Sequence, residues 1–376
     1  NLRGAAMKFG QLLSLDETVI LSPDLAAIFA QLQSSGYSMT PSQLKKVLNH
    51  NWGDDWLKHF KYFDVRPFAA ASIGQVHKAT LKSGEVVAIK VQFPGVKQSI
   101  DSDLATLKFI MKTSGMLPAN FPLDHYIAQC GDLLKRETNY ELEAENINLF
   151  SGFLNGSKVI HVPKVYNKLS TDQTLTMSFL EGRELSNIMN FDQSVRDEIS
   201  LHLIQLLFNE IFNFRMVQTD PNLANFLLSE GGKSLCVLDF GACSQVSEET
   251  DRLYKDLLTG ALSLDVNTIK RVLKENNFIP EEISHAGTKF LDNIISVAIH
   301  ELSKDEIFDF QKSKVFQLIL EENFNLFFDL IPSSSLGSDF IFIQRKIFGL
   351  ILFFRAIGTK LPLLKILKQQ FKLLKC

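Results

Sequence analysis

The stretch PFAAASIGQVHKATLKSGEVVAIKVQFPG, Pro67 to Gly95, decides the fold. Its apolar alternation predicts two strands, Ile73–Leu81 and Val86–Phe93, joined by a turn over Lys82–Glu85. VAIK places Lys90 inside the second apolar run. A strand hairpin that carries such a lysine is how a protein kinase begins its nucleotide pocket, where the lysine contacts the ATP phosphates. The sequence therefore predicts a nucleotide site at Lys90.

A protein kinase has a glycine-rich loop before this hairpin, but here the loop reads Ala69, Ala70, Ala71 and Ser72. Glycine lets backbone N–H groups close around phosphate because it has no Cβ and tolerates positive φ. Alanine lacks that freedom and has a high helix propensity. We therefore expect a stiffer, more helix-prone loop that grips a nucleotide differently. The alternative is a tight connection that contacts no phosphate.

Two further motifs follow in the order found in kinases. QTDPNLANF gives Asp220 and Asn225 the D-x-x-x-x-N spacing of a catalytic loop, and LDFGA places Asp239 downstream of a short predicted strand pair. We expect Asp220 to orient or deprotonate the attacking oxygen. Asn225 and Asp239 are expected to bind Mg²⁺ through oxygen, which this hard cation prefers. The motifs together predict phosphoryl transfer with ATP or ADP and Mg²⁺ as ligands.

A buried lysine needs an anionic partner. The acidic segment RETNYELEAEN offers four glutamates as candidates, namely Glu137, Glu141, Glu143 and Glu145. Most side chains of an acidic helix face solvent, so we expect one or two of them to face the pocket. The spacing does not choose between Glu137 and Glu143.

The order of elements predicts an α+β, protein-kinase-like two-lobe fold. We expect a helical extension over residues 1–55, an N-lobe with a mixed sheet over residues 56–180, and a mainly helical C-lobe over residues 181–376. The apolar run Ile347–Phe354 is too short to span a bilayer and is expected to be a buried helix. The other expected elements are helices at Pro23–Gln33, from Thr40 toward His50, at Asp101–Thr113 and at Leu123–Phe150, and strands at Phe63–Pro67, Pro163–Tyr166, Gln173–Phe179, Phe226–Leu228 and Leu235–Leu238.

Composition narrows the class of protein. The 376 residues carry a net charge of −3, so no global basic field predicts a nucleic-acid partner. The four cysteines show no CxxC spacing, which argues against a disulfide framework and a zinc site and suits a reducing compartment. The chain starts with Asn1 inside an amphipathic helical pattern, so we expect that an upstream segment with targeting information is missing from it.

Several motifs together resemble the UbiB family of atypical kinases, also called aarF-domain-containing kinases. They are AAMKFGQLLS at Ala5–Ser14, AAASIGQVH at Ala69–His77, VAIKVQFPGV at Val87–Val96, RETNYELEAEN, QTDPNLANF and LDFGA. The resemblance covers most of residues 1–245, and QRKIFG near Gln344 is compatible with it. QTDPN is similar to the form found in the mitochondrial coenzyme Q branch.

The resemblance implies roles for particular residues. The KxGQ helix, here with Lys8, Gly10 and Gln11, would fold over the active site and block a protein substrate. Lys90 and the alanine-rich loop would contact phosphate, and Glu137 and Glu143 would be acidic partners of Lys8 or Lys90. Asp220 would be the acidic residue of the catalytic loop, and Asn225 and Asp239 would bind metal. Asn139 stands where relatives often have Asp, and we expect it to loosen the acidic helix.

The resemblance also implies a cellular role. It predicts an Mg-ATP-dependent atypical kinase or ATPase that supports coenzyme Q (ubiquinone) biosynthesis at the matrix face of the inner mitochondrial membrane. The implied partners are other coenzyme Q biosynthesis enzymes, anionic inner-membrane lipids and a quinone precursor or other phenolic small molecule. The alternatives are a protein or small-molecule kinase with an open substrate cleft, and a catalytically silent nucleotide-binding scaffold.

Overall fold

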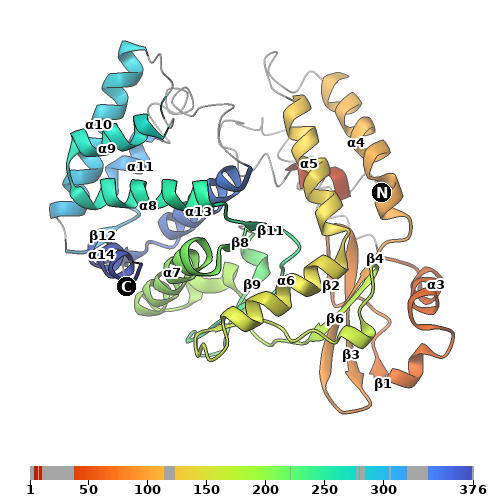
Figure 1. Cartoon of the computed structure of the whole chain (residues 1–376). Coiled ribbons are helices and arrows are strands. Elements are labelled where there is room, and N and C mark those ends of the chain that lie inside the picture. Colours follow the sequence, from red (N-terminus) through yellow and green to blue (C-terminus); the bar gives the residue numbers. More distant parts are fainter. Residues whose placement is uncertain are drawn as a thin grey trace. The chain divides into compact units, whose positions relative to one another are not determined.

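The computed structural model describes residues 4–6, 8–10, 38–113, 123–220, 222–276, 279, 284–304, 306–319 and 338–374 (Figure 1). The chain divides into an N-terminal unit, Asn1–Gly182 with Cys236–Ala242, and a C-terminal unit, Arg183–Leu235 with Cys243–Cys376. The Asp-Phe-Gly stretch at Asp239 therefore belongs to the N-terminal unit. The expected helix Pro23–Gln33 and Gln11 lie outside the described residues. The boundaries expected near residues 55 and 180 stay predictions.

An antiparallel sheet forms the centre of the N-terminal unit, so the expected mixed sheet is wrong. Its strands run in the order β1-β3-β4-β6, and β2 also pairs with β3. The register places Lys90 on β4 opposite Val76 on β3 and Leu175 on β6, so its strand has a neighbour on each side. This confirms the predicted hairpin and the strand near Gln173–Phe179. The strands are β1 (Phe60–Phe63), β2 (Ala69–Ala70), β3 (Gly74–Leu81), β4 (Val86–Gln92) and β6 (Thr174–Ser178).

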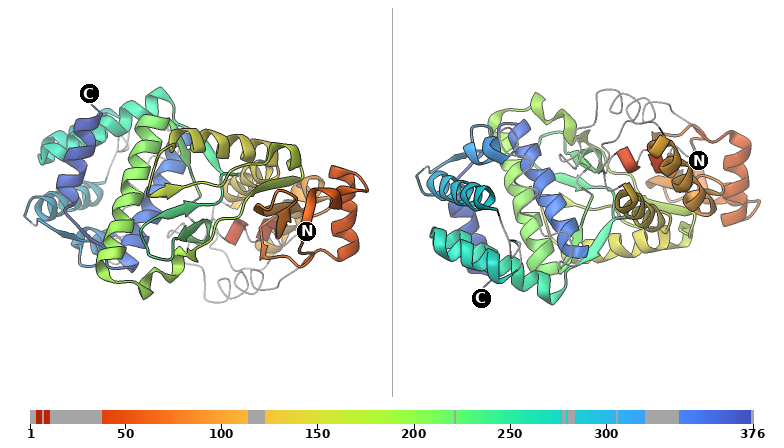
Figure 2. Two further views of the ribbon diagram at one scale, coloured as in Figure 1. Left: turned by 90° about the horizontal axis from the view of Figure 1, so that it is seen from below. Right: turned by 90° about the horizontal axis from the view of Figure 1, so that it is seen from above.

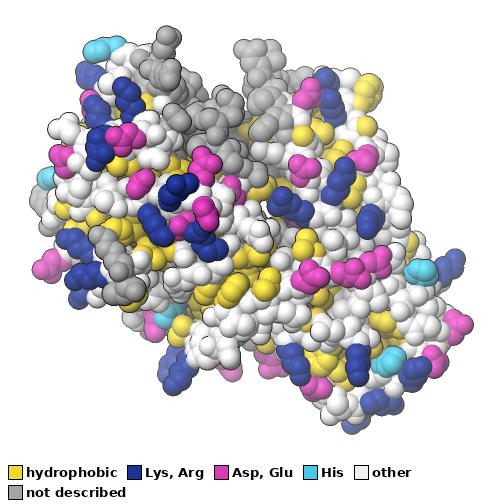
Figure 3. Space-filling view, in the orientation of Figure 1, with side chains coloured by type: hydrophobic (Ala, Val, Ile, Leu, Met, Phe, Trp, Pro, Cys, Tyr) yellow, Lys and Arg dark blue, Asp and Glu magenta, His cyan; other side chains and the backbone are white. Residues whose placement is uncertain are grey.

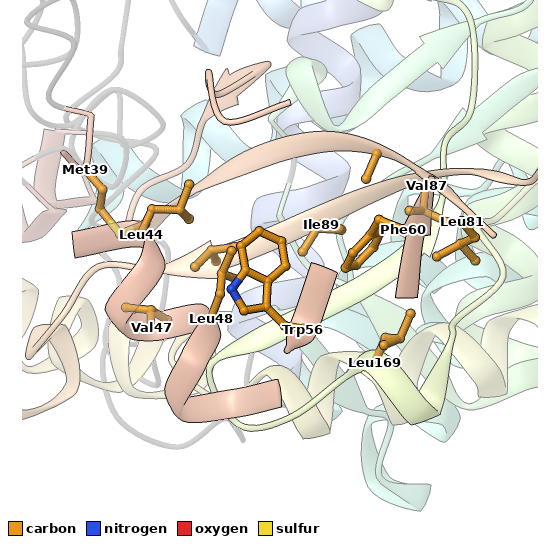
Figure 4. Packing of buried hydrophobic residues seen from close by; sticks show 12 residues of the cluster. Met39, Leu44, Val47, Leu48, Trp56, Phe60, Leu81, Val87, Ile89 and Leu169 are labelled. Atoms are coloured by element: carbon orange, nitrogen blue, oxygen red, sulfur yellow. The ribbon is translucent and has the colours of Figure 1, made fainter. Parts of the chain in front are cut away.

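Helix α3 (Pro41–Trp52) packs its apolar face on this sheet, followed by the 3₁₀ turn η1 (Trp56–His59). A capping box begins this helix, because Gln43 N donates to Thr40 Oγ1 at 3.3 Å and Thr40 N donates to Gln43 Oε1 at 2.9 Å. Figure 4 shows Leu48 and Trp56 stacked against strand residues such as Ile89. Each large apolar side chain buried in this way stabilises the fold by about 1.5–3 kcal/mol.

Two expected strands of the N-terminal unit were wrong. The strand predicted at Phe63–Pro67 ends at Phe63, because the Asp64 carboxylate accepts a hydrogen bond from Arg66 N at 3.0 Å and turns the chain. The segment Pro163–Tyr166 makes only an isolated bridge, between Val165 and Met177. A proline cannot donate to a strand ladder, which limits pairing there.

The acidic segment forms two helices where the sequence predicted one. Helix α5 (Leu123–Glu137) ends before Thr138, and α6 (Tyr140–Phe153) begins after Asn139. The Asn139 side chain caps α6 by accepting from Leu142 N at 3.1 Å. Asn and Asp cap helices about equally well, and the expected loosening by Asn139 stays a prediction. Helix α4 (Val96–Thr113), which starts five residues before its predicted start at Asp101, lies beside α5 (Figure 1).

The C-terminal unit is mainly helical. Helix α7 (Gln193–Phe208) continues into the π-helical segment η4 (Asn209–Phe214), and α7 lies beside α13 (Ser338–Ala356) in both views of Figure 2. Helix α13 contains Ile347–Phe354, and the burial of Leu350, Phe353 and Phe354 confirms the predicted buried helix. The other helices of this unit are α8 (Glu248–Ser263), α9 (Val266–Glu275), α10 (His285–Lys304), α11 (Lys314–Gln317) and α14 (Leu363–Leu373).

The short strands of the C-terminal unit form antiparallel pairings. They are β7 (Arg183–Glu184) with β9 (Phe226–Leu228), β8 (Met216–Gln218) with β11 (Cys243–Gln245), and β12 (Phe308–Asp309) with β13 (Lys360–Leu361). The remaining short elements of the chain are β5 (Ile160–His161), β10 (Leu235–Val237), η2 (Asn167–Leu169), η3 (Leu185–Asn190) and η5 (Leu223–Asn225).

The surface charges and the hydropathy of the helices can be compared with the composition of the chain. On the face drawn in Figure 3, Lys and Arg side chains lie interspersed with Asp and Glu, as the small net charge predicts. Within the described residues, no helix is both long enough and apolar enough to cross a bilayer.

Candidate active site

Lys90 lies inside the N-terminal unit between two carboxylates. Its Nζ donates to Glu143 Oε1 at 2.6 Å and to Asp239 Oδ2 at 2.9 Å, and the residue is only 8% exposed. Strand β4 positions the lysine, α6 positions Glu143, and Asp239 stands in the returning Asp-Phe-Gly stretch. The sequence left Glu137 and Glu143 open as partners of Lys90, and the structure pairs it with Glu143.

The electrostatics of this cluster keep Lys90 charged. Burial acts to lower the pKa of the Lys90 ammonium, but the Asp239 and Glu143 carboxylates outweigh it and raise the pKa above its ordinary value. Burial raises the pKa of Glu143, with Lys90 acting against it. For Asp239, burial is outweighed by Lys90, so the pKa of that carboxyl is lowered. Asp239 therefore holds the negative charge more firmly than Glu143.

The Asp-Phe-Gly stretch is fixed by hydrogen bonds and by an aromatic contact. Asp239 Oδ1 accepts from Gly241 N at 3.0 Å, and Asn146 Nδ2 donates to the Phe240 carbonyl at 2.9 Å. The ring of Phe240 packs on Phe150 with centroids 4.8 Å apart. Asn146 and Phe150 both come from α6, the helix that carries Glu143. One helix therefore places both the partner of Lys90 and the backbone next to Asp239.

A second lysine enters the same unit from the start of the chain. Lys8 lies in a helical stretch, is 4% exposed and forms an ion pair with Glu137. Glu137 also accepts a hydrogen bond from the Ser72 hydroxyl at the end of the alanine-rich loop. A Cβ on Gly4 would come within 2.9 Å of the Ser72 carbonyl oxygen, so the helical stretch and the loop are in close contact. Gln11, the other predicted residue of this motif, lies outside the described residues.

The alanine-rich loop is extended, so the expected helix-prone loop is wrong. Ala69 and Ala70 form β2 and pair with Val76 and Gln75 of β3. Both alanines are exposed, and Ala71 N donates to the Gly74 carbonyl at 3.0 Å. Ladder hydrogen bonds to β3 outweigh the helix propensity of alanine, which is a weak preference. The phosphate-binding role of Ala69, Ala70, Ala71 and Ser72 stays a prediction.

In the C-terminal unit, the predicted catalytic loop forms a compact turn. Asp220 Oδ1 accepts from Asn222 N, and Asp220 Oδ2 accepts from Asn225 Nδ2, both at 3.1 Å. Asn222 in turn caps the 3₁₀ turn η5 by accepting from Ala224 N at 3.1 Å. The spacing of five residues thus brings the Asp220 carboxylate and the Asn225 amide into direct contact.

Each unit carries an oxygen donor of the kind that a divalent hard cation prefers, Asp239 in the N-terminal unit and Asn225 in the C-terminal unit. In the N-terminal unit, the ammoniums of Lys8 and Lys90 accompany the carboxylates of Glu137, Glu143 and Asp239, which leaves one net negative charge. The Asp239 side chain is 32% exposed, so its carboxylate is accessible. Asn225 uses its nitrogen toward Asp220, so its oxygen is not consumed in that bond. Carboxylate and amide oxygens are the donors that Mg²⁺ prefers.

Sequence reasoning missed three residues of the N-terminal unit. Tyr140 is 2% exposed, and its hydroxyl has no hydrogen-bond partner among the described residues. Burial and nearby carboxylates raise the pKa of Tyr140, so this hydroxyl stays protonated as a donor. Asn146 stands one helical turn after Glu143, a spacing that could have revealed it. Gly74 of β3 lies so close to β4 that a Cβ on it would come within 2.3 Å of the Val91 carbonyl oxygen. It could have been found because glycine inside a strand often marks such a close backbone approach.

Comparison with known proteins assigns the family. The ABC1 atypical kinase-like domain matches residues 31–273 of the chain. The chain belongs to this family. The predicted resemblance to atypical kinases and the predicted α+β kinase-like fold class are therefore confirmed.

Three relatives illustrate the similarity. The chain is 40% identical to the atypical kinase COQ8, mitochondrial, of Saccharomyces cerevisiae over 70% of its own length and 53% of that protein. It is 34% identical to the atypical kinase COQ8B, mitochondrial, of Danio rerio over 85% of the chain and 51% of that protein. For the atypical kinase coq-8, mitochondrial, of Caenorhabditis elegans, the identity is 36% over 74% of the chain and 37% of that protein. The chain thus spans about half or less of these relatives.

A solved structure supports the fold. The structure of Rv3197 from Mycobacterium tuberculosis in complex with erythromycin superposes with a TM-score of 0.68 and 20% sequence identity. The match covers 95% of this chain and 89% of that one. At this identity the likeness concerns the fold and not the ligand.

Proposed function

We propose that this chain is the phosphotransferase part of an Mg-ATP-dependent atypical kinase or ATPase that supports coenzyme Q biosynthesis in the mitochondrion. The observation that carries the proposal is the Lys90 ammonium held between Glu143 and Asp239. An ammonium has three N–H donors, and these two contacts use two of them. The third can bind a phosphate oxygen, while the carboxylates keep the lysine charged and oriented.

The proposed reaction moves the γ-phosphoryl group of ATP to an attacking oxygen and releases ADP. Lys90 would bind and orient the phosphates, and Asp220 would accept the proton of the attacking hydroxyl or water. Asp239 and Asn225 would hold Mg²⁺, which supplies charge neutralisation at the phosphates when bound. The hydrogen bond from Asn225 holds the Asp220 carboxylate in one orientation, which favours proton transfer from a defined position.

The cellular setting is part of the same proposal. The relatives named COQ8 and COQ8B carry the word mitochondrial in their names, which supports a mitochondrial location. We extend this to the matrix face of the inner membrane, with anionic lipids, a quinone precursor or other phenolic small molecule, and other coenzyme Q enzymes as partners. The buried Lys8–Glu137 pair supports an ATPase more than a protein kinase, because the KxGQ helix is implied to block protein substrates.

Asp239→Asn tests the metal and nucleotide assignment. The variant should lose Mg-dependent ADP binding and ATP turnover, because it removes a carboxylate ligand and one counterion of Lys90. Phosphate release by the purified chain without protein substrate and isothermal titration with Mg-ADP measure the two effects. Asp101→Asn is the matched control, since Asp101 also pairs with a lysine but its side chain is 82% exposed.

Three outcomes would overturn parts of the proposal. Equal Mg-ADP affinity and turnover in Asp239→Asn would contradict the metal assignment. Nucleotide binding without turnover in the unmodified chain, with and without anionic vesicles and a phenolic quinone-head mimic, would indicate a scaffold. Phosphorylation of an added peptide at a rate above phosphate release would indicate an ordinary protein kinase.

A further inference from the structure

A buried ion pair in the C-terminal unit lies outside the predicted active-site residues. Lys346 of α13 forms an ion pair with Glu210 of η4, and the two side chains are 4% and 1% exposed. Apolar residues surround this region, since Ile211, Val217 and Ile343 belong to one buried cluster. Burial raises the pKa of Glu210, and the Lys346 charge acts against this shift. Burying two charges is costly, and apolar residues of similar volume often stabilise a protein as well or better.

The ion pair is connected to the catalytic loop through Gln218. Glu210 Oε1 accepts from Gln218 N at 3.4 Å, and Gln218 Nε2 donates to the Asp220 carbonyl at 3.0 Å. Gln218 is 1% exposed, and its side-chain oxygen has no hydrogen-bond partner among the described residues. An amide held in this way is costly for stability, because its buried acceptor is unsatisfied. It fixes, however, the backbone of Asp220.

The local backbone supports the same connection. Glu210 stands in a π-helical segment, which is rare and frequent at functional sites. The segment ends at Phe214, its C-cap Arg215 is a non-glycine residue with φ of +56°, and β8 follows immediately. Strand β8 pairs with β11 and ends at Gln218, two residues before Asp220. The π-helical turn therefore places Glu210 where it can face both Lys346 and the end of β8.

We propose that Lys346, Glu210 and Gln218 are positioning residues that hold the Asp220 backbone in place for phosphoryl transfer. The ion pair anchors the end of β8 to α13, and the Gln218 amide transmits this anchor to the Asp220 carbonyl. The role rests on the proposed function for its effect on turnover. Its effect on the order of the loop stands without that function.

The test replaces the ion pair by an apolar pair, Lys346→Met with Glu210→Met. The double variant should regain the thermal stability that Lys346→Met alone loses, because no unpaired charge stays buried. If the pair positions Asp220, kcat should nevertheless fall about 10- to 100-fold, since small misplacements of catalytic groups cost that much. Mg-ADP affinity should fall much less than kcat, because Lys90 and Asp239 are left unchanged by these substitutions. Amide exchange measured by mass spectrometry should become faster in the peptide over residues 216–226.

Two further variants complete the test. Gln218→Met leaves the ion pair intact and should give the same faster exchange and the same loss of kcat. Lys270→Met is the matched control, because Lys270 pairs with Asp292 in the same unit at 35% and 43% exposure. It should match the unmodified chain in kcat, affinity and exchange.

Each variant has an outcome that would overturn the proposal. A double variant or a Gln218→Met variant with unmodified kcat and slow exchange would make the pair a purely structural contact. If the unmodified chain shows no ATP turnover, the proposed function fails. The exchange of residues 216–226 then still decides whether the ion pair and Gln218 hold the loop.

Discussion

Lys90 stays charged inside the N-terminal unit because two carboxylates face its ammonium, and this arrangement could be predicted only in part. The sequence indicated the lysine from VAIK and the aspartate from LDFGA, since both motifs are local. It could not choose between Glu137 and Glu143, because side-chain direction depends on where α6 begins. Asn139 caps α6 and so sets that start, but no glycine or proline in the sequence marks the break between α5 and α6.

His77 is a second buried titratable residue in the same sheet, and it is held neutral. Its ring is fully buried, with Nε2 2.7 Å from Gln75 Nε2 and Nδ1 2.9 Å from the Asp64 carbonyl oxygen. Burial lowers the pKa of His77 below its ordinary value of 6.5. Below about pH 6.5 the unfolded chain therefore binds a proton at His77, whereas the folded chain binds this proton only at lower pH.

This shift predicts a loss of stability in acid. The free energy of unfolding should fall as the pH drops below about 6.5 through the lowered folded pKa, by up to about 1.4 kcal/mol per pH unit for one proton. His77→Asn should be less stable at neutral pH but should lose less on acidification. Tryptophan fluorescence reports this unit, because Trp52 and Trp56 are the two tryptophans of the chain and both lie in it. The exposed His50→Asn is the control, and an unchanged slope in His77→Asn would contradict the assignment.

At the scale of elements, the β3–β4 hairpin depends on close backbone approach at Gly74. A Cβ there would lie 2.3 Å from the Val91 carbonyl oxygen, closer than any real contact allows. The sequence indicated the hairpin correctly because alternation and the Ser83-Gly84 turn are local signals. It misjudged the alanine-rich loop and the strand near Phe63–Pro67, because pairing with β3 and the Asp64 turn are tertiary effects.

Gly74→Ala should therefore weaken the hairpin that carries Lys90. We expect a loss of about 1–3 kcal/mol in the free energy of unfolding, since backbone must shift to admit the methyl group. Nucleotide binding should fall with it, because the register of Lys90 against β3 depends on this contact. Denaturant unfolding followed by tryptophan fluorescence measures the change. Gly152→Ala in α6 is the matched control, since no atom lies within 4 Å of its added Cβ, and an equal effect of both changes would refute the steric argument.

At the scale of the whole molecule, the chain returns to its N-terminal unit after residue 235, and no local pattern announces this. Residues 236–242 bring Asp239 to Lys90 across 149 positions of sequence. The order of motifs indicated that the parts belong to one fold, which the family match confirms. The pairing of Lys8 with Glu137 also joins residues that are far apart in sequence, and only the resemblance to known kinases pointed to it.

The Lys8–Glu137 contact gives the last prediction, because it ties the start of the chain to α5. Lys8→Ala leaves the Glu137 carboxylate, 13% exposed, without its ammonium partner, and breaking a buried pair costs roughly 3–5 kcal/mol when burial is complete. The helical stretch at Gly4 should then separate from Ser72, while the sheet core around Ile89 stays folded. Limited proteolysis with mass spectrometry should show faster cleavage within residues 1–55 and an unchanged pattern over β3 and β4. The exposed Lys46→Ala is the control, and cleavage of Lys8→Ala at the unmodified rate would mean that the pair does not hold this segment.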